Sequence, residues 1–444
     1  MIRRCMTIFR LALPVMISQI SMIVVAFADN SMVGHYSTEA FASSSFVVNV
    51  FNLVMFCAMG FSYGLTPLVG ALFSQGRKTD IGHLVRVALR ANLVMGLILT
   101  AIMTVLYLFL DKLGQKPELL PIIRPYYLIT LAGILPVVVF NVFAQWSFAI
   151  RRTAMPMWIL LAANALNIIG NYMLIYGHWG APELGLAGAG VSTLTARMIA
   201  MAAILMVFFG SRGFGEYRRG YTATRVSPPG EMRRVVKTSV PVALQMTFET
   251  GAFSFAVIFA GWLGTVALAA FQVIVIVGTL GFCIYYSVGT AITVEVSNCA
   301  GRSGLPACRR PALDGYVVML VCAAVSSTIF VALGPTLSRL FTDDPRVVSA
   351  AVGVLFPLVL YQLGDCTQVT FANALRGTAN VMPMLWIAFI SYIVIGIPST
   401  LLLAFPAGLG LYGIVLSFSV SLFTAGALFM YTFFKTTHNF TNLK

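Results

Sequence analysis

The sequence predicts an all-α integral membrane protein with twelve transmembrane helices in two pseudo-symmetric six-helix bundles. Three observations support this fold class. The 444 residues are 59% hydrophobic and only 9% charged, a composition that polytopic membrane proteins have and soluble domains lack. The apolar residues fall into twelve runs, each at or above the roughly 20 residues that a helix needs to cross a bilayer. The first run also recurs in the second half of the chain.

The twelve apolar runs are continuous rather than alternating. They lie at residues 8–33, 44–73, 86–110, 121–149, 156–177, 186–209, 236–260, 266–298, 312–333, 348–375, 383–404 and 409–434. Without the period-two alternation of transmembrane strands, helices are favoured over a β-barrel. The run at 44–73 is longer than a crossing requires, so we expect it to tilt or to extend beyond the bilayer.

The internal repeat divides the chain into halves. Residues 10–47 can be laid on residues 237–274, so that Pro14 falls on Pro241 and Gly34 on Gly261. We expect an N-terminal lobe at 1–210, a cytoplasmic linker at 211–235 and a C-terminal lobe at 236–444. Because each lobe has an even number of spans, the symmetry axis is expected to run along the membrane normal.

The net charge of +14 reflects membrane orientation rather than a nucleic-acid partner. Lys and Arg concentrate in the segments on one side of the predicted membrane. The other side carries only Lys112, Lys116, Arg124, Arg339 and Arg346. This excess predicts that both termini are cytoplasmic. No soluble basic domain is left to bind nucleic acid, and the seven cysteines form no CxxC pair that would indicate a zinc site.

Four acids lie inside predicted spans: Asp29, Glu249, Glu295 and Asp365. An acid at mid-span costs roughly 2.5–3.5 kcal/mol, so such residues should face a bundle interior or a wet cavity. In the repeat overlay, Glu249 falls on Met22, which shares a helix face with Asp29. The two lobes therefore place an acid on the same face at different depths.

Span ten predicts a second polar face. Tyr361, Asp365 and Gln368 lie at i, i+4 and i+7, so they share one side of a helix. If Glu249 approaches Asp365 across the C-terminal bundle, the two carboxylates can hold a hard cation such as Na+ or share a proton. Glu295, near the cytoplasmic end of span eight, either joins this site or pairs with an Arg or lipid headgroup.

Span five carries three asparagines on one face, Asn164, Asn167 and Asn171. Asn167 and Asn171 either join Asp29 in a polar N-terminal site or bond neighbouring helices, the role we assign to Asn164. Arg197 in span six either neutralises a carboxylate such as Glu295 or lines a wet cavity. His83, in a predicted cytoplasmic segment, is expected to be solvated.

No catalytic constellation is present in the sequence. There is no Walker A loop, GxSxG or HExxH motif, so we expect neither an enzyme nor direct coupling to ATP. Two parallel six-helix bundles around a central cleft are the plan of a secondary transporter.

Several motifs resemble the multidrug and toxic compound extrusion (MATE) family, on its NorM-like branch. They are FADNSMVG at 27–34, NIIGNYMLIYG with LGLAGAG at 167–190, PVALQMTFE at 241–249, YQLGD at 361–365 and ALRGTA at 374–379. They occur in both halves, so the resemblance covers essentially the whole chain. DinF-type members look poorer in C-lobe acids, so Glu249 with Asp365 favours the NorM side.

The resemblance implies export of amphipathic, often cationic, drugs or toxins in exchange for Na+ or H+. It implies alternating access, no cofactor beyond the coupling ion, and a multi-pass carrier, expected to be monomeric, in the bacterial cytoplasmic (inner) membrane. The matching positions are the N-lobe acid Asp29, the polar pair Asn167 and Asn171, the hydroxyl Thr193, and the C-lobe residues Glu249, Tyr361 and Asp365.

Two other functions stay open at this stage. A lipid-linked oligosaccharide flippase would need a cleft lined with Arg and Lys, and only Arg197 lies well inside a span. A non-transporting scaffold or receptor would leave four intramembrane acids unexplained. Neither the choice between Na+ and H+ nor the lobe that binds the ion follows from the sequence.

Overall fold

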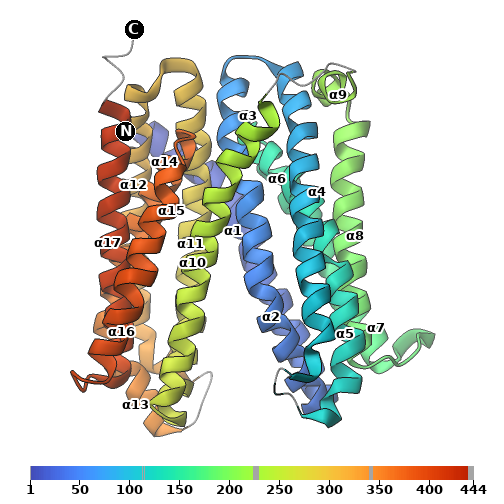
Figure 1. The fold of residues 1–444 in the computed structure, drawn as a ribbon, viewed down its shortest axis with the longest axis vertical. Helices are drawn as coiled ribbons and strands as arrows, with labels where there is room; N and C mark the ends of the chain where they lie inside the picture. The colour runs from blue at the N-terminus through green and yellow to red at the C-terminus, as the bar shows by residue number, and fades with distance from the viewer. Residues whose placement is uncertain (1, 113, 115, 224–229, 340–343, 439–444) are drawn as a thin grey trace. The chain divides into compact units, whose positions relative to one another are not determined.

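The computed structural model describes residues 2–112, 114, 116–223, 230–339 and 344–438, without the side chains of residues 337 and 338. The described residues are nearly all helical and contain no β-strand (Figure 1). They include eleven helices that are long and apolar enough to cross a membrane, or twelve spans if one bent helix pair counts as one. The predicted all-α membrane fold is confirmed. Part of the predicted linker, residues 224–229, lies outside the described residues.

The helices follow the predicted runs closely. The first half of the chain comprises α1 (Ile2–Tyr36), α2 (Thr38–Tyr63), α3 (Leu65–Ser74), α4 (Lys78–Leu108), η1 (Leu110–Lys112), η2 (Pro117–Leu119), α5 (Leu120–Ala132), α6 (Ile134–Ala149), α7 (Ala154–Tyr176), η3 (His178–Gly180), α8 (Leu186–Gly210), η4 (Arg212–Phe214) and α9 (Gly215–Thr222).

The second half of the chain is also built from long helices, some of them interrupted. It comprises α10 (Glu231–Trp262), α11 (Thr265–Ser303), η5 (Leu305–Cys308), α12 (Arg309–Arg339), α13 (Pro345–Gly353), α14 (Leu355–Gly377), α15 (Met382–Ala388), the π-helix η6 (Phe389–Gly396), α16 (Ile397–Ala404) and α17 (Gly410–His438). Span ten is the bent pair α13 and α14, with an angle of 48° between them.

The chain packs into two compact units. The first, here the N unit, holds residues 17–65 and 76–243, and the second, the C unit, holds residues 1–16, 66–75 and 244–444. The boundaries fall inside α1 and α10, shortly after Pro14 and Pro241. Each of these helices therefore begins in one unit and continues in the other. The functional division at 1–210, 211–235 and 236–444 stays a prediction.

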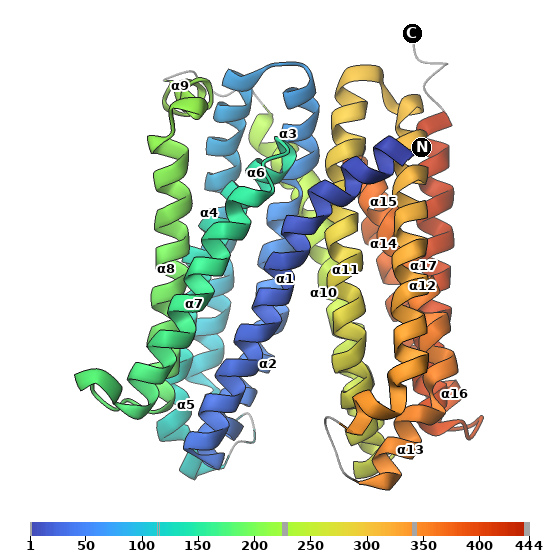
Figure 2. The ribbon, with the colours of Figure 1, turned by 180° about the vertical axis from the view of Figure 1, so that it is seen from behind.

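The start of α1 and the end of α17 lie at the same end of the C unit, as Figure 2 shows. Arg4 Nε lies 3.0 Å from Asp314 Oδ2 near the start of α12. Arg309, the first residue of α12, donates from Nη2 to the Phe434 carbonyl (3.0 Å) and from Nε to Thr437 Oγ1 (2.9 Å) in the last turns of α17. An even number of crossings requires this arrangement. The cytoplasmic side of these ends stays a prediction.

The helix α9 docks against α4 in the N unit. Two glycines allow the helices to approach this closely. A Cβ at Gly82 would collide with the Tyr217 carbonyl, and one at Gly220 with the Thr79 carbonyl. Trp146 packs edge-on against two neighbouring aromatic rings. The distance between ring centroids is 4.9 Å to Phe208 and 5.5 Å to Tyr217 of α9. Burial raises the pKa of Tyr217 to about 12, so its phenol stays neutral.

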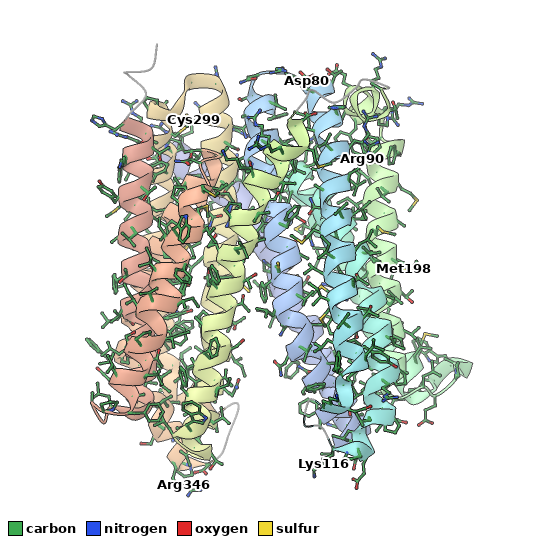
Figure 3. All side chains as sticks on the ribbon, in the orientation of Figure 1. Asp80, Arg90, Lys116, Met198, Cys299 and Arg346 are labelled. Carbon is green, nitrogen blue, oxygen red and sulfur yellow. The ribbon has the colours of Figure 1, made fainter. Side chains whose placement is uncertain are left out.

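The prediction that His83 is solvated is wrong. It is 6% exposed, with Nε2 lying 2.8 Å from Glu231 Oε2 at the start of α10. Arg86 Nη2 lies 3.0 Å from Nδ1 of the same ring. Because a guanidinium only donates, this contact puts the ring proton on Nε2, facing the carboxylate. His83 thus ties α10 to α4, at the end of the N unit where Figure 3 labels Asp80 and Arg90.

The α4–α9 contact predicts a measurable cost for one methyl group. Gly82→Ala should lower the free energy of unfolding by about 1–3 kcal/mol, because the new Cβ displaces the Tyr217 carbonyl. The matched control is Gly251→Ala, where a Cβ in α10 meets open space, and where the effect should be neutral or stabilising by roughly 0.5–1 kcal/mol. Thermal unfolding in detergent gives both values, and equal melting temperatures for the two variants would refute the contact.

Candidate functional site

Close packing of α7 on α8 builds a polar cluster in the N unit. A Cβ at Gly170 would overlap the Ser192 side chain, and one at Gly188 would overlap the Leu174 carbonyl. Small residues of this kind let transmembrane helices approach closely enough for their polar side chains to bond. The approach brings the asparagine face of α7 against Thr193 of α8.

The cluster gathers the predicted N-lobe residues around Asp29. Asn171 Nδ2 donates to Asp29 Oδ1. In the amide orientation that satisfies its neighbours, Asn167 Nδ2 donates to Asp29 Oδ1 (3.0 Å), while its Oδ1 accepts from the Thr193 N–H and hydroxyl (both 3.1 Å). The structure therefore brings Asp29, Asn167, Asn171 and Thr193 together. Asn164 instead donates to Ser21 Oγ (2.8 Å), the helix-bonding role predicted for it.

Arg197 supplies positive charge to the same cluster, which is one of its two predicted roles, although the carboxylate is Asp29 and not the suggested Glu295. Its guanidinium interacts electrostatically with Asp29 and with Tyr126 of α5. It also reaches the break between α5 and α6, where a Cβ on Gly133 would lie 2.6 Å from Nη1. A cation is favourable there because the C-terminal end of α5 carries partial negative charge. The Asp29 carboxylate thus has two amide donors and a nearby cation.

The C unit holds a second cluster with a different charge balance. Asp365 of α14 is 2% exposed, and its Oδ2 has no hydrogen-bond partner among the described residues. Asp365 interacts electrostatically with another acid, Glu249 of α10. Tyr361 interacts with both acids. The two acids thus interact electrostatically, as the sequence predicts, and their role as an ion site stays a prediction.

Glu249 is the better compensated of the two acids. Gln245, one turn earlier in α10, donates from Nε2 to Glu249 Oε2 (3.4 Å). Gln245 Oε1 accepts from Arg376 Nη2 (3.3 Å), and Arg376 Nη1 donates to Asn373 Oδ1 (3.1 Å). Arg376 also attracts Glu249 electrostatically. The sequence reasoning missed Gln245 and Arg376, although the i, i+4 spacing of Gln245 to Glu249 was available.

The two clusters therefore differ in what they lack. An ionised Asp29 meets amide donors and Arg197, whereas an ionised Asp365 meets a second carboxylate and no donor to Oδ2. A buried anion in that position needs a proton or a bound cation to balance it. The C unit is where the described residues leave a charge uncompensated.

Two further candidates remain less defined. Gln368 is 1% exposed in α14, and its Oε1 has no hydrogen-bond partner among the described residues. Glu295 in α11 interacts electrostatically with Cys299, which also senses Arg4. Glu295 and Arg4 thus both interact with Cys299. The prediction that Glu295 pairs with an Arg or a lipid headgroup, and its alternative, a role in the ion site, both stay predictions.

A double-mutant cycle tests the Asp29–Arg197 interaction. Arg197→Met should destabilise the protein more in the presence of Asp29 than in an Asp29→Asn background, because the first case leaves a buried carboxylate without its cation. We expect a coupling energy of about 1–2 kcal/mol between the two sites, measured by thermal unfolding in detergent. Strictly additive effects would contradict the interaction.

Comparisons with known proteins find relatives over almost the whole chain. A chain annotated "Probable multidrug resistance protein NorM" from Bradyrhizobium diazoefficiens is 30% identical over 430 residues, 96% of this chain and 92% of that protein. A protein of the same description from Geobacillus kaustophilus is 29% identical over 426 residues, 95% of this chain and 93% of that protein.

Solved structures share the fold at low sequence identity. An outward-facing multidrug resistance MATE family transporter of the MOP superfamily superposes with a TM-score of 0.89 at 18% identity, over 98% of this chain and 96% of that chain. A MOP superfamily transporter from Pyrococcus furiosus gives a TM-score of 0.88 at 17% identity, over 99% and 97%. The MatE family model matches residues 14–173 and 241–402, so the chain belongs to the MatE family, the multidrug and toxic compound extrusion transporters.

Proposed function

We propose that this chain is a secondary active antiporter that exports amphipathic, often cationic, drugs or toxins in exchange for Na+ or H+. Family membership supports transport, and relatives named as probable multidrug resistance proteins support this class of substrate. One observation carries the ion coupling: Asp365 is buried beside Glu249 with an oxygen that has no partner among the described residues.

The proposal places the coupling ion in the C unit. A bound cation or proton there removes the repulsion between two acids, so its binding free energy is large enough to bias a conformational equilibrium. In the N unit, Arg197 already provides positive charge beside Asp29. We therefore assign Asp29, Asn167, Asn171 and Thr193 to the transport cycle as a polar centre that requires no bound ion for charge balance.

The mechanism proposed is alternating access. Ion binding from outside favours the state that releases the substrate, and ion release inside favours the state that takes up the next one. The carrier works as a monomer in the bacterial cytoplasmic membrane under this proposal. Neither ATP nor another cofactor takes part.

The flippase alternative is less well supported than drug export. A pyrophosphate-binding cleft needs free cationic side chains, but Arg197 is engaged with Asp29 and Arg376 with Gln245 and Asn373. Both guanidinium groups are thus directed toward protein partners.

Asp365→Asn tests the proposed coupling directly. Removing the charge that the ion compensates should slow gradient-driven export of a cationic dye from proteoliposomes at least about tenfold, which corresponds to a loss of 1.4 kcal/mol. Na+ and pH gradients are imposed separately, so that the same experiment identifies the ion.

Glu39→Gln is the matched control for this test. Glu39 is an exposed acid in the first turn of α2, so its neutralisation should leave export unchanged. Asp29→Asn is expected to lower export without altering the ion dependence. If the unmodified protein moves no dye under either gradient, or if Asp365→Asn behaves like the control, the antiporter proposal is wrong.

A further inference from the structure

The π-helical turn η6 interrupts span eleven in the C unit. It runs from Phe389 to Gly396 and lies between α15 and α16. The Ile397 N–H donates to the Tyr392 carbonyl, five residues earlier. Pro398, near the start of α16, explains the widening, because a proline ring in a regular α-helix clashes with the carbonyl four residues earlier. Single π-helical turns of this kind are frequent at functional sites.

The π-helical turn contains a buried tyrosine, Tyr392, whose hydroxyl group is unpaired among the described residues. Tyr392 is 1% exposed, and its OH has no hydrogen-bond partner among the described residues. Its ring packs in the apolar core of the C unit, together with Phe418 and Leu422. The aromatic ring is thus fixed by packing, while the hydroxyl remains available to a ligand. Leaving such a group unpaired is costly unless something binds there.

Tyr392 interacts electrostatically with the acid cluster. The strongest of these interactions is with Glu249, and weaker ones are with Asp365 and Tyr361. A second buried tyrosine of the unit shows the usual arrangement, since Tyr285 OH lies 2.8 Å from Ser326 Oγ. Tyr392 differs from Tyr285 in having no such partner among the described residues.

A cation held between the two acids needs neutral ligands in addition. Among the described residues, no group of three His, Cys, Asp or Glu side chains could hold a metal ion. Carboxylate and neutral oxygens suit hard cations, whose coordination numbers exceed two. Glu249 and Asp365 alone therefore do not complete a coordination shell, and a phenol oxygen beside them is chemically suited to do so.

We propose that Tyr392, set by the π-helical turn, is a neutral oxygen ligand for a hard monovalent cation held by Glu249 and Asp365. This inference rests on the proposed antiport function and goes beyond it by assigning the site to a cation of the Na+ class. Span eleven then contributes a ligand to the ion site through a residue of its π-helical turn.

Tyr392→Phe tests the assignment with little change in shape. The variant should raise the Na+ concentration for half-maximal dye export at least about tenfold, while export at saturating Na+ is retained. Binding of ²²Na+ to the purified protein should weaken by a similar factor. The increase in melting temperature caused by Na+ over K+ should also be lost, although the variant folds as well as the parent without Na+.

Ser391→Ala is the control within the same turn. Ser391 is fully buried, and its Oγ also has no partner among the described residues, so this variant likewise removes one unpaired hydroxyl from the turn. It should leave the Na+ dependence unchanged. A shift with Ser391→Ala equal to that of Tyr392→Phe would show a general effect of the turn and would overturn the ligand assignment.

The remaining outcomes separate the inference from the function on which it rests. If the parent protein responds to Na+ but Tyr392→Phe leaves both export and ²²Na+ binding unaltered, the inference fails and antiport stands. If only a pH gradient drives export, the cation ligand is refuted while antiport again stands. If neither gradient drives export, the proposed function itself fails.

Discussion

The hydrocarbon core of a bilayer offers no water to hydrogen-bond a peptide group or to solvate a charge, and this constraint shapes the whole molecule. It forces the apolar runs into helices, because only a helix satisfies the backbone within one segment. It also forces every intramembrane charge to find a partner inside the protein or to recruit one from outside. Asp29 has found its partners in Asn171, Asn167 and Arg197. Asp365 interacts with a second acid, Glu249, and its Oδ2 has no partner among the described residues, which is why we propose an external ion to balance its charge.

Much of the scaffold could be predicted because helical periodicity is a property of one segment at a time. The spacing of Asn167 and Asn171 placed both on one face of α7, and the structure joins that face to Asp29. The partners of Asp29 across the bundle were harder to predict. Whether Arg197 faces Asp29 depends on how α8 is rotated against α1 and α5, and no local pattern encodes that rotation.

Other features were missed because they depend on contacts between distant segments or on a change of helical register. His83 looked solvated when assigned to a loop, but α4 begins at Lys78 and α9 covers its first turns. Arg376 is linked to Glu249 through the Gln245 side chain, a contact between distant segments. Tyr392 lies in a π-helical turn, which the period of 3.6 residues does not describe. Pro398 is the sequence feature that indicates an interruption of the helix in span eleven, but a proline does not indicate whether the interruption is a kink or a π-helical turn.

The helix α1 begins in one compact unit and continues in the other, and this has a consequence for biosynthesis. Cys5 and Asp314 are contact partners separated by 309 residues. At about 5–20 residues per second, the ribosome needs roughly 15–60 s to supply the partner of the first helical turns. During this time the first turns of α1 are synthesised but lack the segment of the C unit against which they pack. Assembly of the C unit is a late event that requires both ends of the polypeptide, so the two halves are not independent folding modules.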